Sequence, residues 1–390
     1  MPGYEVIGKE EQKALNKLFN DNRKKLGKIP IFRPGLYINK FEKKFAKYIG
    51  VKYACCVTSG TAAIKVALVA AGVKRGDEVI IQSFTFVAPV EAIVDLGAIP
   101  ILVNIDDTLN MCPQELTKKI TKKTKVIMPV HMLGVAADMD KIMKIARQKK
   151  IIVIDDNCEA LGAKWGNKKL GAQSDMCTWS FDNGKTITTG EGGMITTNNK
   201  EMIKLCREYM DHGHENNPNF SRGRDTHRIY GFNFRPTEFT GILGLVQLAK
   251  INFITKKNKE NYNFFMKALK KYKQIKFRKI LKKNVPLHDC IIFNFQSTKL
   301  ANTFVKEIAS NGIVTKNVPM AIEWHFAKYW DHIFKLQNIS KAKLANILKP
   351  SSEILERSVA IPVYVNDKKK ELIHKSRIMQ KALNKILSAK

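Results

Sequence analysis

The sequence predicts an α/β protein with a large domain built on a mainly parallel central sheet flanked by helices and a smaller C-terminal α/β domain. At 390 residues, the chain is longer than a typical single domain. Between about residues 41 and 248, short apolar runs alternate with amphipathic stretches, a pattern typical of βαβ units. After residue 250, lysine-rich helical stretches are interrupted by short strands. We therefore expect a large domain over residues 1–250 and a small domain over residues 251–390.

Apolar periodicity predicts the main elements of both domains. The expected strands of the large domain are short apolar runs at residues 78–81, 99–103, 126–130 and 151–154. The expected helices cover residues 61–71 and 138–149. The polar segment 212–235 has no clear period and is expected to be a long loop of the kind that tends to be functional in compact domains. In the small domain, residues 289–295 form an expected strand.

Composition and cysteine usage favour a cytoplasmic enzyme. Hydrophobic residues make up 44% of the chain, and no apolar run approaches the ~18 residues that suggest a membrane span. The first residues lack the charged and apolar regions of a secretory signal. The seven cysteines are odd in number and include no CxxC pair, so neither a disulfide framework nor a zinc site is indicated. We expect reduced thiols, no metal and no membrane partner.

The formal net charge of +32 is the one unusual bulk property. Taken alone, such a charge suggests a nucleic-acid or membrane-surface partner. The lysines, however, are spread along the chain in short runs without interleaved aromatic residues. A compositional bias therefore explains them better than a nucleic-acid site, although a positive field could help to recruit an anionic nucleotide sugar or sugar acid.

One lysine lies where covalent cofactor chemistry would need it. Lys185 stands between Ser180 and the glycine-rich turn at residues 190–193, which suits a lysine that forms a Schiff base with an aldehyde cofactor. Asp155 and Asp156 end the apolar run 151–154, and open α/β sheets bind ligands at the carboxyl ends of their strands. A carboxylate there can keep a pyridinium nitrogen protonated. Pyridoxal phosphate needs both groups.

Two further segments have the character of a cofactor site. Residues 58–63 form a small-residue turn before a helical stretch, which offers backbone N–H groups to a phosphate. An ordinary serine or threonine N-cap is the alternative interpretation. Residues 82–88 follow an expected strand, so that Phe84 or Phe86 could lie over a flat ring; core packing is an equal alternative for either side chain.

Together with these segments, a series of motifs resembles the DegT/DnrJ/EryC1/StrS family of pyridoxal-phosphate sugar aminotransferases, of the fold type I class. The matching motifs, in the order of the family, are Ser59-Gly60-Thr61-Ala62-Ala63, Gly76-Asp77-Glu78-Val79-Ile80, Thr85-Phe86-Val87-Ala88, Pro129-Val130-His131, Asp156 with Leu161-Gly162-Ala163, Ser180-Phe181, Lys185, Thr188 to Gly193, Asp211-His212-Gly213, Gly231-Phe232-Asn233-Phe234-Arg235 and Ile361-Pro362-Val363-Tyr364. The resemblance thus covers nearly the whole chain.

The resemblance implies a role for each matching residue. Lys185 carries the cofactor and moves the proton, Asp156 pairs with the ring nitrogen with Asp155 as its rival, and Phe86 stacks on the ring. The residues implied to hold the phosphate are Thr61, Ala62 and Ser180. Asn233 is implied to reach the cofactor phosphate of a neighbouring subunit, which predicts a homodimer with shared active sites. Local turn roles remain the alternative for Ser180 and Asn233.

The chain departs from the family pattern at Glu159, where many members have a glutamine near the phenolic oxygen of the cofactor. A carboxylate facing a phenolate is repulsive unless a proton is shared or a cation sits close, so we expect Glu159 to be protonated or to turn away. A second departure, Asn104 in place of an acid, has no expected catalytic consequence. Members that dehydrate sugars carry a histidine at the position of Lys185, so the lysine favours transamination.

The resemblance implies a ping-pong transfer of an amino group from an amino acid, L-glutamate first among donors, to a keto-sugar. A nucleotide-linked hexose is the leading acceptor class. The opening residues 1–5 and the segment 211–215 also resemble the branch that aminates an oxidised 3-deoxy-octulosonic acid; either product would serve surface polysaccharide or lipopolysaccharide biosynthesis. The candidate sugar-side residues are His131, His214 and His325, with packing at least as good an explanation for Trp324. A non-aminating sugar dehydratase and a cofactor-binding regulator are weaker alternatives.

Overall fold

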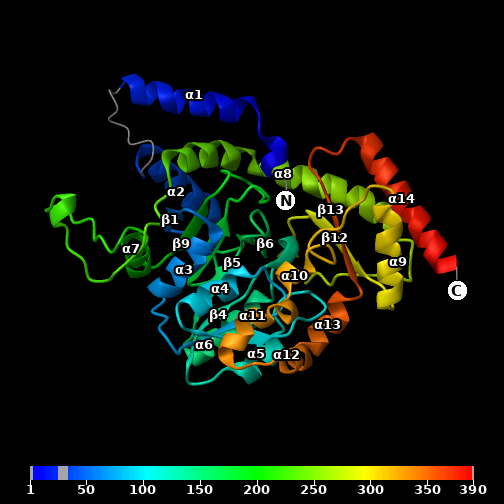
Figure 1. Cartoon of the computed structure of the whole chain (residues 1–390). Helices are drawn as coiled ribbons and strands as arrows, with labels where there is room; N and C mark the ends of the chain where they lie inside the picture. The colour runs from blue at the N-terminus through cyan, green and yellow to red at the C-terminus, as the bar shows by residue number, and fades with distance from the viewer. Residues whose placement is uncertain (1–2, 25–33, 389–390) are drawn as a thin grey trace.

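A seven-stranded sheet forms the centre of the computed structural model, which describes residues 3–24 and 34–388 (Figure 1). The strand order is β1-β9-β8-β5-β4-β2-β3, and within this sheet β9 runs antiparallel to both of its neighbours while the other pairings are parallel. The strands are β1 (Tyr53–Val57), β2 (Glu78–Gln82), β3 (Ile99–Val103), β4 (Thr124–Met128), β5 (Ile152–Asp156), β8 (Met176–Ser180) and β9 (Gly193–Thr197). The expected mainly parallel central sheet is confirmed.

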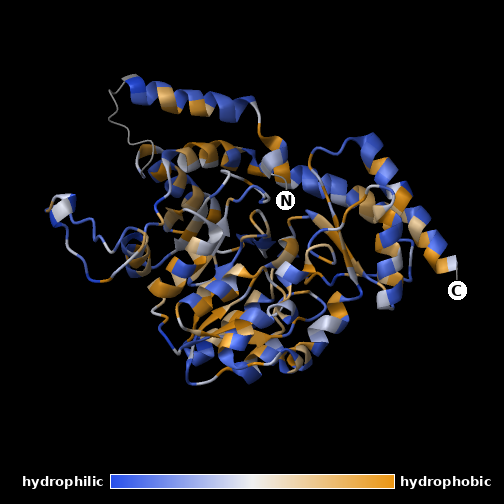
Figure 2. Ribbon diagram, in the orientation of Figure 1, coloured by the Kyte–Doolittle hydropathy of each residue, from blue (hydrophilic) through white to orange (hydrophobic). Residues whose placement is uncertain are grey.

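Burial on both faces explains why these apolar runs form central strands. In β2, Val79 and Ile81 belong to one hydrophobic core and Ile80 to another, and all three are fully buried. Continuous aliphatic runs are typical of parallel strands that are covered on both faces. The apolar interior and the polar outer faces of the helices are visible in Figure 2. The helices of this body include α2 (Leu36–Ile49), α3 (Gly60–Ala70), α4 (Ala88–Asp95), α5 (Pro113–Lys119), α6 (Met139–Lys149) and α7 (Lys200–Tyr209).

A smaller antiparallel sheet of order β10-β12-β13 forms the C-terminal region. Its strands are β10 (Lys276–Phe277), β12 (Cys290–Asn294) and β13 (Ser358–Pro362), and it packs with α9 (Thr298–Ala309) and α14 (Lys369–Ser388). A third, small sheet joins β11 (Asn284–Val285) to β6 (Lys164–Trp165) and β7 (Lys168–Lys169). Every strand and helix expected from the sequence lies within two residues of its observed position. A periodic pattern predicts where an element begins and ends less reliably than it predicts the element itself.

The domain boundary expected at residues 250 and 251 differs from the structure in two ways. First, α8 (Glu238–Leu269) runs continuously through that point, with Ile251 in a core shared with α2 and Phe265 in the core of the C-terminal sheet. Second, residues 318–355 return to the large body, where Trp330 and Phe334 join its main core. Because one continuous helix packs into both cores, its apolar pattern has no break between them. The sequence therefore does not show where one domain ends and the next begins.

The returning segment consists of short helices. They are α10 (Ile322–His325), α11 (Asp331–Phe334), α12 (Lys341–Ile347) and α13 (Lys349–Leu355). At the other end of the chain, α1 (Lys9–Lys24) packs along α8. Within the described ranges, no helix has both the length and the apolar composition required to cross a bilayer.

The loop expected over residues 212–235 is present and extends away from the body beside α7 (Figure 1). It contains one short 3-10 helix, Arg222–Arg224. Asp211 anchors it through ion pairs with Arg222 at 2.6 Å and with Arg235 at 2.5 Å. Two of its aromatic side chains, Tyr230 and Phe232, are exposed.

Candidate active site

A pocket of about 450 Å³ opens at the carboxyl ends of the central strands. This is the edge at which parallel sheets place their ligands, because the connections that leave each strand converge there. One part of the pocket lining, here called the sheet wall, is formed by residues at or after the carboxyl ends of β1, β2, β5 and β8: Ser59 to Thr61, Thr85, Phe86, Asp156, Cys158, Glu159, Ser180 and Lys185. A second part, the C-terminal wall, is formed by Lys316, Asn317 and His325.

Lys185 and Asp156, the two expected catalytic residues, both line this pocket. Asp156 is the last residue of β5, and its Oδ1 accepts a hydrogen bond from the backbone N–H of Cys158 at 2.9 Å. Burial raises the pKa of Asp156 above its ordinary value, despite this hydrogen bond and the charge of Lys185. Lys185 stands in the connection from β8 to β9, where its carbonyl oxygen accepts a hydrogen bond from Gly3 N–H at 2.8 Å.

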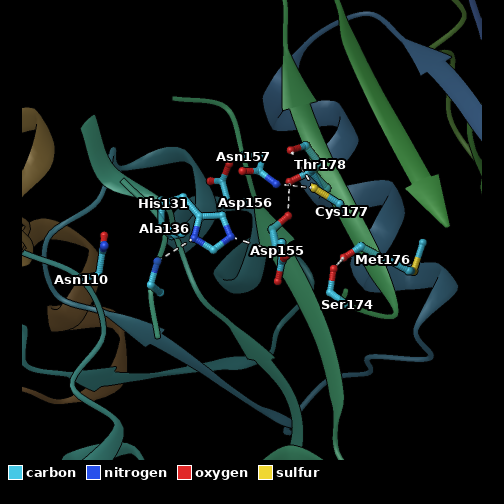
Figure 3. Close-up of polar contacts among 12 residues, drawn as sticks. Asn110, His131, Ala136, Asp155, Asp156, Asn157, Ser174, Met176, Cys177 and Thr178 are labelled. Carbon is cyan, nitrogen blue, oxygen red and sulfur yellow. Dashed lines mark hydrogen bonds and ion pairs between the residues drawn. The ribbon is translucent and has the colours of Figure 1, made fainter. Parts of the chain in front are cut away.

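Asp155 and Asp156 face opposite sides of β5, and this difference decides which of them faces the pocket. Asp155 is fully buried and does not line the pocket. Its Oδ2 lies 3.5 Å from Nε2 of His131 on the far side of the strand (Figure 3). Successive side chains of a strand point to opposite faces, so one of the pair must face the pocket and the other the core. The geometry assigns the pocket position to Asp156.

A phosphate-sized cradle lies at the N-terminus of α3. Ser59 caps this helix by accepting a hydrogen bond from the backbone N–H of Ala62 at 3.1 Å, and Thr61 lines the pocket. A Cβ added to Gly60 would lie only 2.8 Å from Cβ of Ser180 and 3.3 Å from Sγ of Cys158. The helix end therefore offers N–H donors to an anion, and the absence of a side chain at Gly60 lets α3 approach Ser180 closely.

These groups fit pyridoxal phosphate. The cradle suits its phosphate, the buried carboxylate of Asp156 suits a protonated ring nitrogen, and Lys185 suits its aldehyde. The exposed ring of Phe86 belongs to the sheet wall. Its centroid lies 5.3 Å from the centroid of the His325 ring. The other candidate, Phe84, is fully buried in the main core, where it only packs.

Glu159 is a buried carboxylate with two hydrogen-bond donors. Its Oε2 accepts from Leu133 N–H at 3.0 Å and its Oε1 from Nδ2 of Asn317 at 3.0 Å. Burial on its own would raise the pKa of Glu159, but the charges of Lys185, His325 and Lys316 and the Leu133 hydrogen bond together lower it to about 2. The sequence predicts a protonated or turned-away Glu159; the structure instead shows the lowered pKa of an ionised carboxylate with cations close by.

The C-terminal wall contains two residues that the sequence analysis missed, Lys316 and Asn317. Lys316 pairs with the fully buried Asp289 at 2.5 Å. Nothing in the local sequence marks it, because it is one of 67 lysines and arginines and lies about 130 residues from Lys185. Lys316 reaches the pocket only because a distant part of the chain folds back to it.

The three histidines expected on the sugar side have different positions. His325 lines the pocket. His131 does not: it is completely buried behind the sheet wall, and its Nδ1 accepts a hydrogen bond from Ala137 N–H at 3.1 Å (Figure 3). The expectation for His131 is thus corrected, because the residue after a strand end can point into the core as readily as into the pocket.

His214 and Asn233 lie on the loop 212–235, outside the pocket of their own chain. Nδ1 of His214 lies 3.2 Å from Asp225 Oδ2, and Oδ1 of Asn233 accepts a hydrogen bond from Arg235 N–H at 3.4 Å. Trp324 is 62% exposed, so it does not pack in a core. Of residues 1–5, Met1 and Pro2 lie outside the described ranges.

Known proteins resemble this chain over most of its length. The model of the DegT/DnrJ/EryC1/StrS aminotransferase family matches residues 7–376. GDP-perosamine synthase of Escherichia coli O157:H7 is 39% identical over 249 residues, which cover 62% of this chain and 67% of the relative. GDP-perosamine synthase of Caulobacter vibrioides is 42% identical over 219 residues, which cover 56% of this chain but only 58% of the relative's own length.

The fold agrees over the whole length of the chain. The solved structure of an aminotransferase from Psychrobacter cryohalolentis is similar, with a TM-score of 0.86 and 26% identity over 98% of both chains. The fold type I architecture expected from the sequence is confirmed, as are the aminotransferase class and, with the family, its dependence on pyridoxal phosphate. The chain belongs to the DegT/DnrJ/EryC1/StrS aminotransferase family.

Proposed function

We propose that this protein transfers the amino group of L-glutamate to the keto group of a nucleotide-linked sugar, in the biosynthesis of a surface polysaccharide. The observation that carries the proposal is the meeting of Lys185, Asp156 and the α3 cradle in one pocket. The GDP-perosamine synthases among the relatives support a nucleotide-linked acceptor over an oxidised octulosonic acid. A single pocket that must accept first the donor and then the acceptor suits a ping-pong reaction.

Each residue of the sheet wall has a distinct task in this proposal. Pyridoxal phosphate, when bound, supplies an electron sink for the carbon that loses or gains a proton. Asp156 holds the ring nitrogen protonated. Because Asp156 is buried, the positive charge of that nitrogen stabilises its carboxylate. Thr61, Ala62 and Ser180 bind the phosphate and so orient the ring, while Phe86 limits its tilt. Lys185 then moves the proton from one carbon to the other.

The visible spectrum of the protein with pyridoxal phosphate tests the proposal. We expect wild type to show the absorbance of the lysine-bound cofactor and L-glutamate to convert it to pyridoxamine phosphate. Lys185→Ala should bind the cofactor but give no turnover. A wild type without this absorbance would contradict the proposal. Spectral conversion by glutamate without transfer to any nucleotide-linked keto-sugar would contradict the acceptor and favour the octulosonic acid or a regulatory role.

We also propose a homodimer in which Asn233 completes the phosphate site of the partner subunit. Its support is the position of Asn233 on a projecting loop with exposed aromatic side chains, away from the pocket of its own chain. Mixing two inactive variants, Lys185→Ala and Asn233→Asp, tests this role. In trans, each hybrid dimer should contain one intact site of its two, so that after random reassortment about one site in four of the mixture is active. No regained activity, with hybrids verified by a tag on one variant, would contradict the shared site.

A further inference from the structure

The connection that carries Lys185 lies between two strands of the central sheet. It covers residues 181–192, from β8 to β9, and consists of turns, bends and irregular backbone. The register of the strands places Asp156 and Ser180 directly, but it does not reach Lys185. Within the connection, the N–H of Lys185 donates to the carbonyl of Asp182 at 3.0 Å. The position of the lysine therefore depends also on contacts from outside the connection.

Gly3 makes the first of these contacts. It is buried, and its N–H donates to the carbonyl oxygen of Lys185 at 2.8 Å. A Cβ added to Gly3 would lie 2.7 Å from that oxygen and 2.8 Å from the backbone nitrogen of Thr188. Both neighbours are backbone atoms, so rotation of a side chain could not relieve the overlap. The absence of a side chain at Gly3 thus lets two distant backbone segments come into direct contact.

The segment that contains this glycine is itself anchored. It forms a short 3-10 helix, Gly3–Val6. The carbonyl of Val6 accepts a hydrogen bond from Nζ of Lys250 in α8 at 2.6 Å. The carbonyl of Glu5 accepts one from Nδ2 of Asn366 at 2.5 Å, and the carboxylate of Glu5 accepts another from the backbone N–H of Asn366 at 3.0 Å. The glycine is therefore held in place by α8 and by the C-terminal region.

A second contact reaches the same connection from α8. Oε1 of Gln247 accepts a hydrogen bond from the backbone N–H of Thr188 at 3.3 Å, and Nε2 of Gln247 donates to Glu11 at 2.8 Å. The amide thus uses its acceptor on one side and its donor on the other. Glu11 in turn forms an ion pair with Lys250 at 2.7 Å. Because Thr188, Gln247 and Glu11 are all buried, loss of the amide would leave polar groups without partners.

We propose that Gly3 and Gln247 are positioning residues, which hold the backbone at Lys185 and just after it so that Nζ of the lysine meets the cofactor. Gly3 holds the lysine's own carbonyl, and Gln247 holds the chain three residues further on. This inference rests on the proposed function, because it requires Lys185 to bond pyridoxal phosphate. The effect can be large, since a misplacement of about 1 Å can cost about 10²-fold in rate.

The test compares the binding of two forms of the cofactor. The aldehyde of pyridoxal phosphate condenses with Nζ of Lys185 and releases water, whereas pyridoxamine phosphate has no aldehyde and depends on the rest of the pocket. In fluorescence titrations of cofactor-free Gly3→Ala, affinity for pyridoxal phosphate should fall by about tenfold and affinity for pyridoxamine phosphate by less than about twofold. Gln247→Met should show the same selectivity with a loss of about threefold. Gly60→Ala should weaken both forms, because both carry the phosphate.

Two controls match these variants in the type of change. Gly8→Ala also adds a Cβ near the N-terminus, but its nearest neighbour would be the end of the Glu10 side chain at 3.6 Å. Gln380→Met also removes a glutamine, which donates to the carbonyl of Ala268 at 3.0 Å and does not line the pocket. Both controls should bind the two forms of the cofactor as wild type does.

The Lys185→Ala background separates positioning from general damage. Adding Gly3→Ala to Lys185→Ala should cause no further loss of affinity for pyridoxal phosphate, because the residue that Gly3 positions is gone. A further loss there would overturn the positioning role. Equal losses for both forms of the cofactor in Gly3→Ala and Gln247→Met, or no loss for either form, would also overturn it, while a normal cofactor absorbance of wild type left the proposed function intact. Absence of that absorbance in wild type would overturn both.

Discussion

The two walls of the pocket differ in how the chain builds them. The sheet wall consists of residues that follow strand ends directly, so Asp156 and Ser180 are positioned by the hydrogen-bonded register of β5 and β8. The C-terminal wall consists of Lys316, Asn317 and His325, which reach the pocket only because residues 318–355 pack back onto the large body. The residues proposed for cofactor chemistry are thus placed by local structure. The charged residues of the C-terminal wall are placed by long-range packing. We expect substitutions in the sheet wall to abolish function and those in the C-terminal wall to modify it.

The largest effect should come from Asp156→Asn. An amide cannot hold the ring nitrogen protonated, so we expect kcat to fall by roughly 10³-fold with the cofactor still bound. In the cofactor-free protein the same change should raise the thermal midpoint near neutral pH, because burial raises the pKa of Asp156 and its ionised form is therefore destabilising. Steady-state kinetics and thermal unfolding measure the two effects.

The matched control is Asp155→Asn, one residue away on the opposite face of β5. Asp155 faces His131 in the core, so its loss should lower stability and leave the spectrum of the bound cofactor unchanged. A larger catalytic loss in Asp155→Asn than in Asp156→Asn would contradict the assignment of the ring contact.

Gly60→Ala should have the next largest effect, by displacing Ser180 of the phosphate cradle. The added Cβ would meet Ser180 Cβ at 2.8 Å, and overpacking of this kind costs about 1–3 kcal/mol. We expect cofactor affinity to fall by about 10- to 100-fold, as measured by fluorescence titration. Gly8→Ala is the control, since the nearest neighbour of its new Cβ would be the end of the Glu10 side chain at 3.6 Å. Equal affinity in both variants would show that the cradle does not bind the phosphate.

The same division between the walls explains what the sequence could predict. Lys185, Asp156 and Thr61 stand beside strand ends and helix starts, and apolar periodicity locates those ends to within two residues. For His131 the periodicity was insufficient, because it gives the end of β4 but not the direction of the side chain after it. Lys316 was missed altogether, since its role depends on a contact between regions that no local pattern encodes.

The domain boundary at residues 250 and 251 fails for a related reason. Amphipathic periodicity shows that α8 is a helix with an apolar face, but it does not show that Leu248 and Leu269 face different cores. Which core a face contacts is decided by tertiary packing, and packing also brings Trp330 back across the expected boundary. The sequence therefore predicts the helices and strands but not the division of the chain into domains.

A smaller effect is expected where the two walls meet, at Glu159. Its pKa is lowered to about 2 from an ordinary 4.5, so its ionisation contributes stability above pH 4.5 that is lost progressively as the pH falls towards 2. In the cofactor-free protein, Glu159→Gln should reduce the loss of unfolding free energy between about pH 6 and about pH 3.5 by about 1 kcal/mol. Urea denaturation at the two pH values measures it. Parallel losses in wild type and variant would contradict an ionised, compensated Glu159.

The smallest expected effect is that of Trp324→Ala in the C-terminal wall region. Trp324 is 62% exposed at the start of the segment that presents His325 to the pocket. Truncation of an exposed side chain should change the unfolding free energy by less than about 0.5 kcal/mol. If this wall faces the acceptor, the KM for the keto-sugar should rise by about fivefold or less, corresponding to less than ~1 kcal/mol. The glutamate half-reaction, followed by the loss of cofactor absorbance, should be unchanged.

These two half-reactions make Trp324→Ala the sharpest test of the division between the walls, despite its small size. The glutamate step requires Lys185 and Asp156 and hence only the sheet wall, whereas a bulky acceptor must also contact the C-terminal wall of a pocket of about 450 Å³. His325→Asn provides the comparison inside the pocket and should raise the acceptor KM further. If Trp324→Ala instead slowed the glutamate step, the C-terminal wall would belong to donor binding, and the proposed separation of cofactor chemistry from acceptor recognition would be wrong.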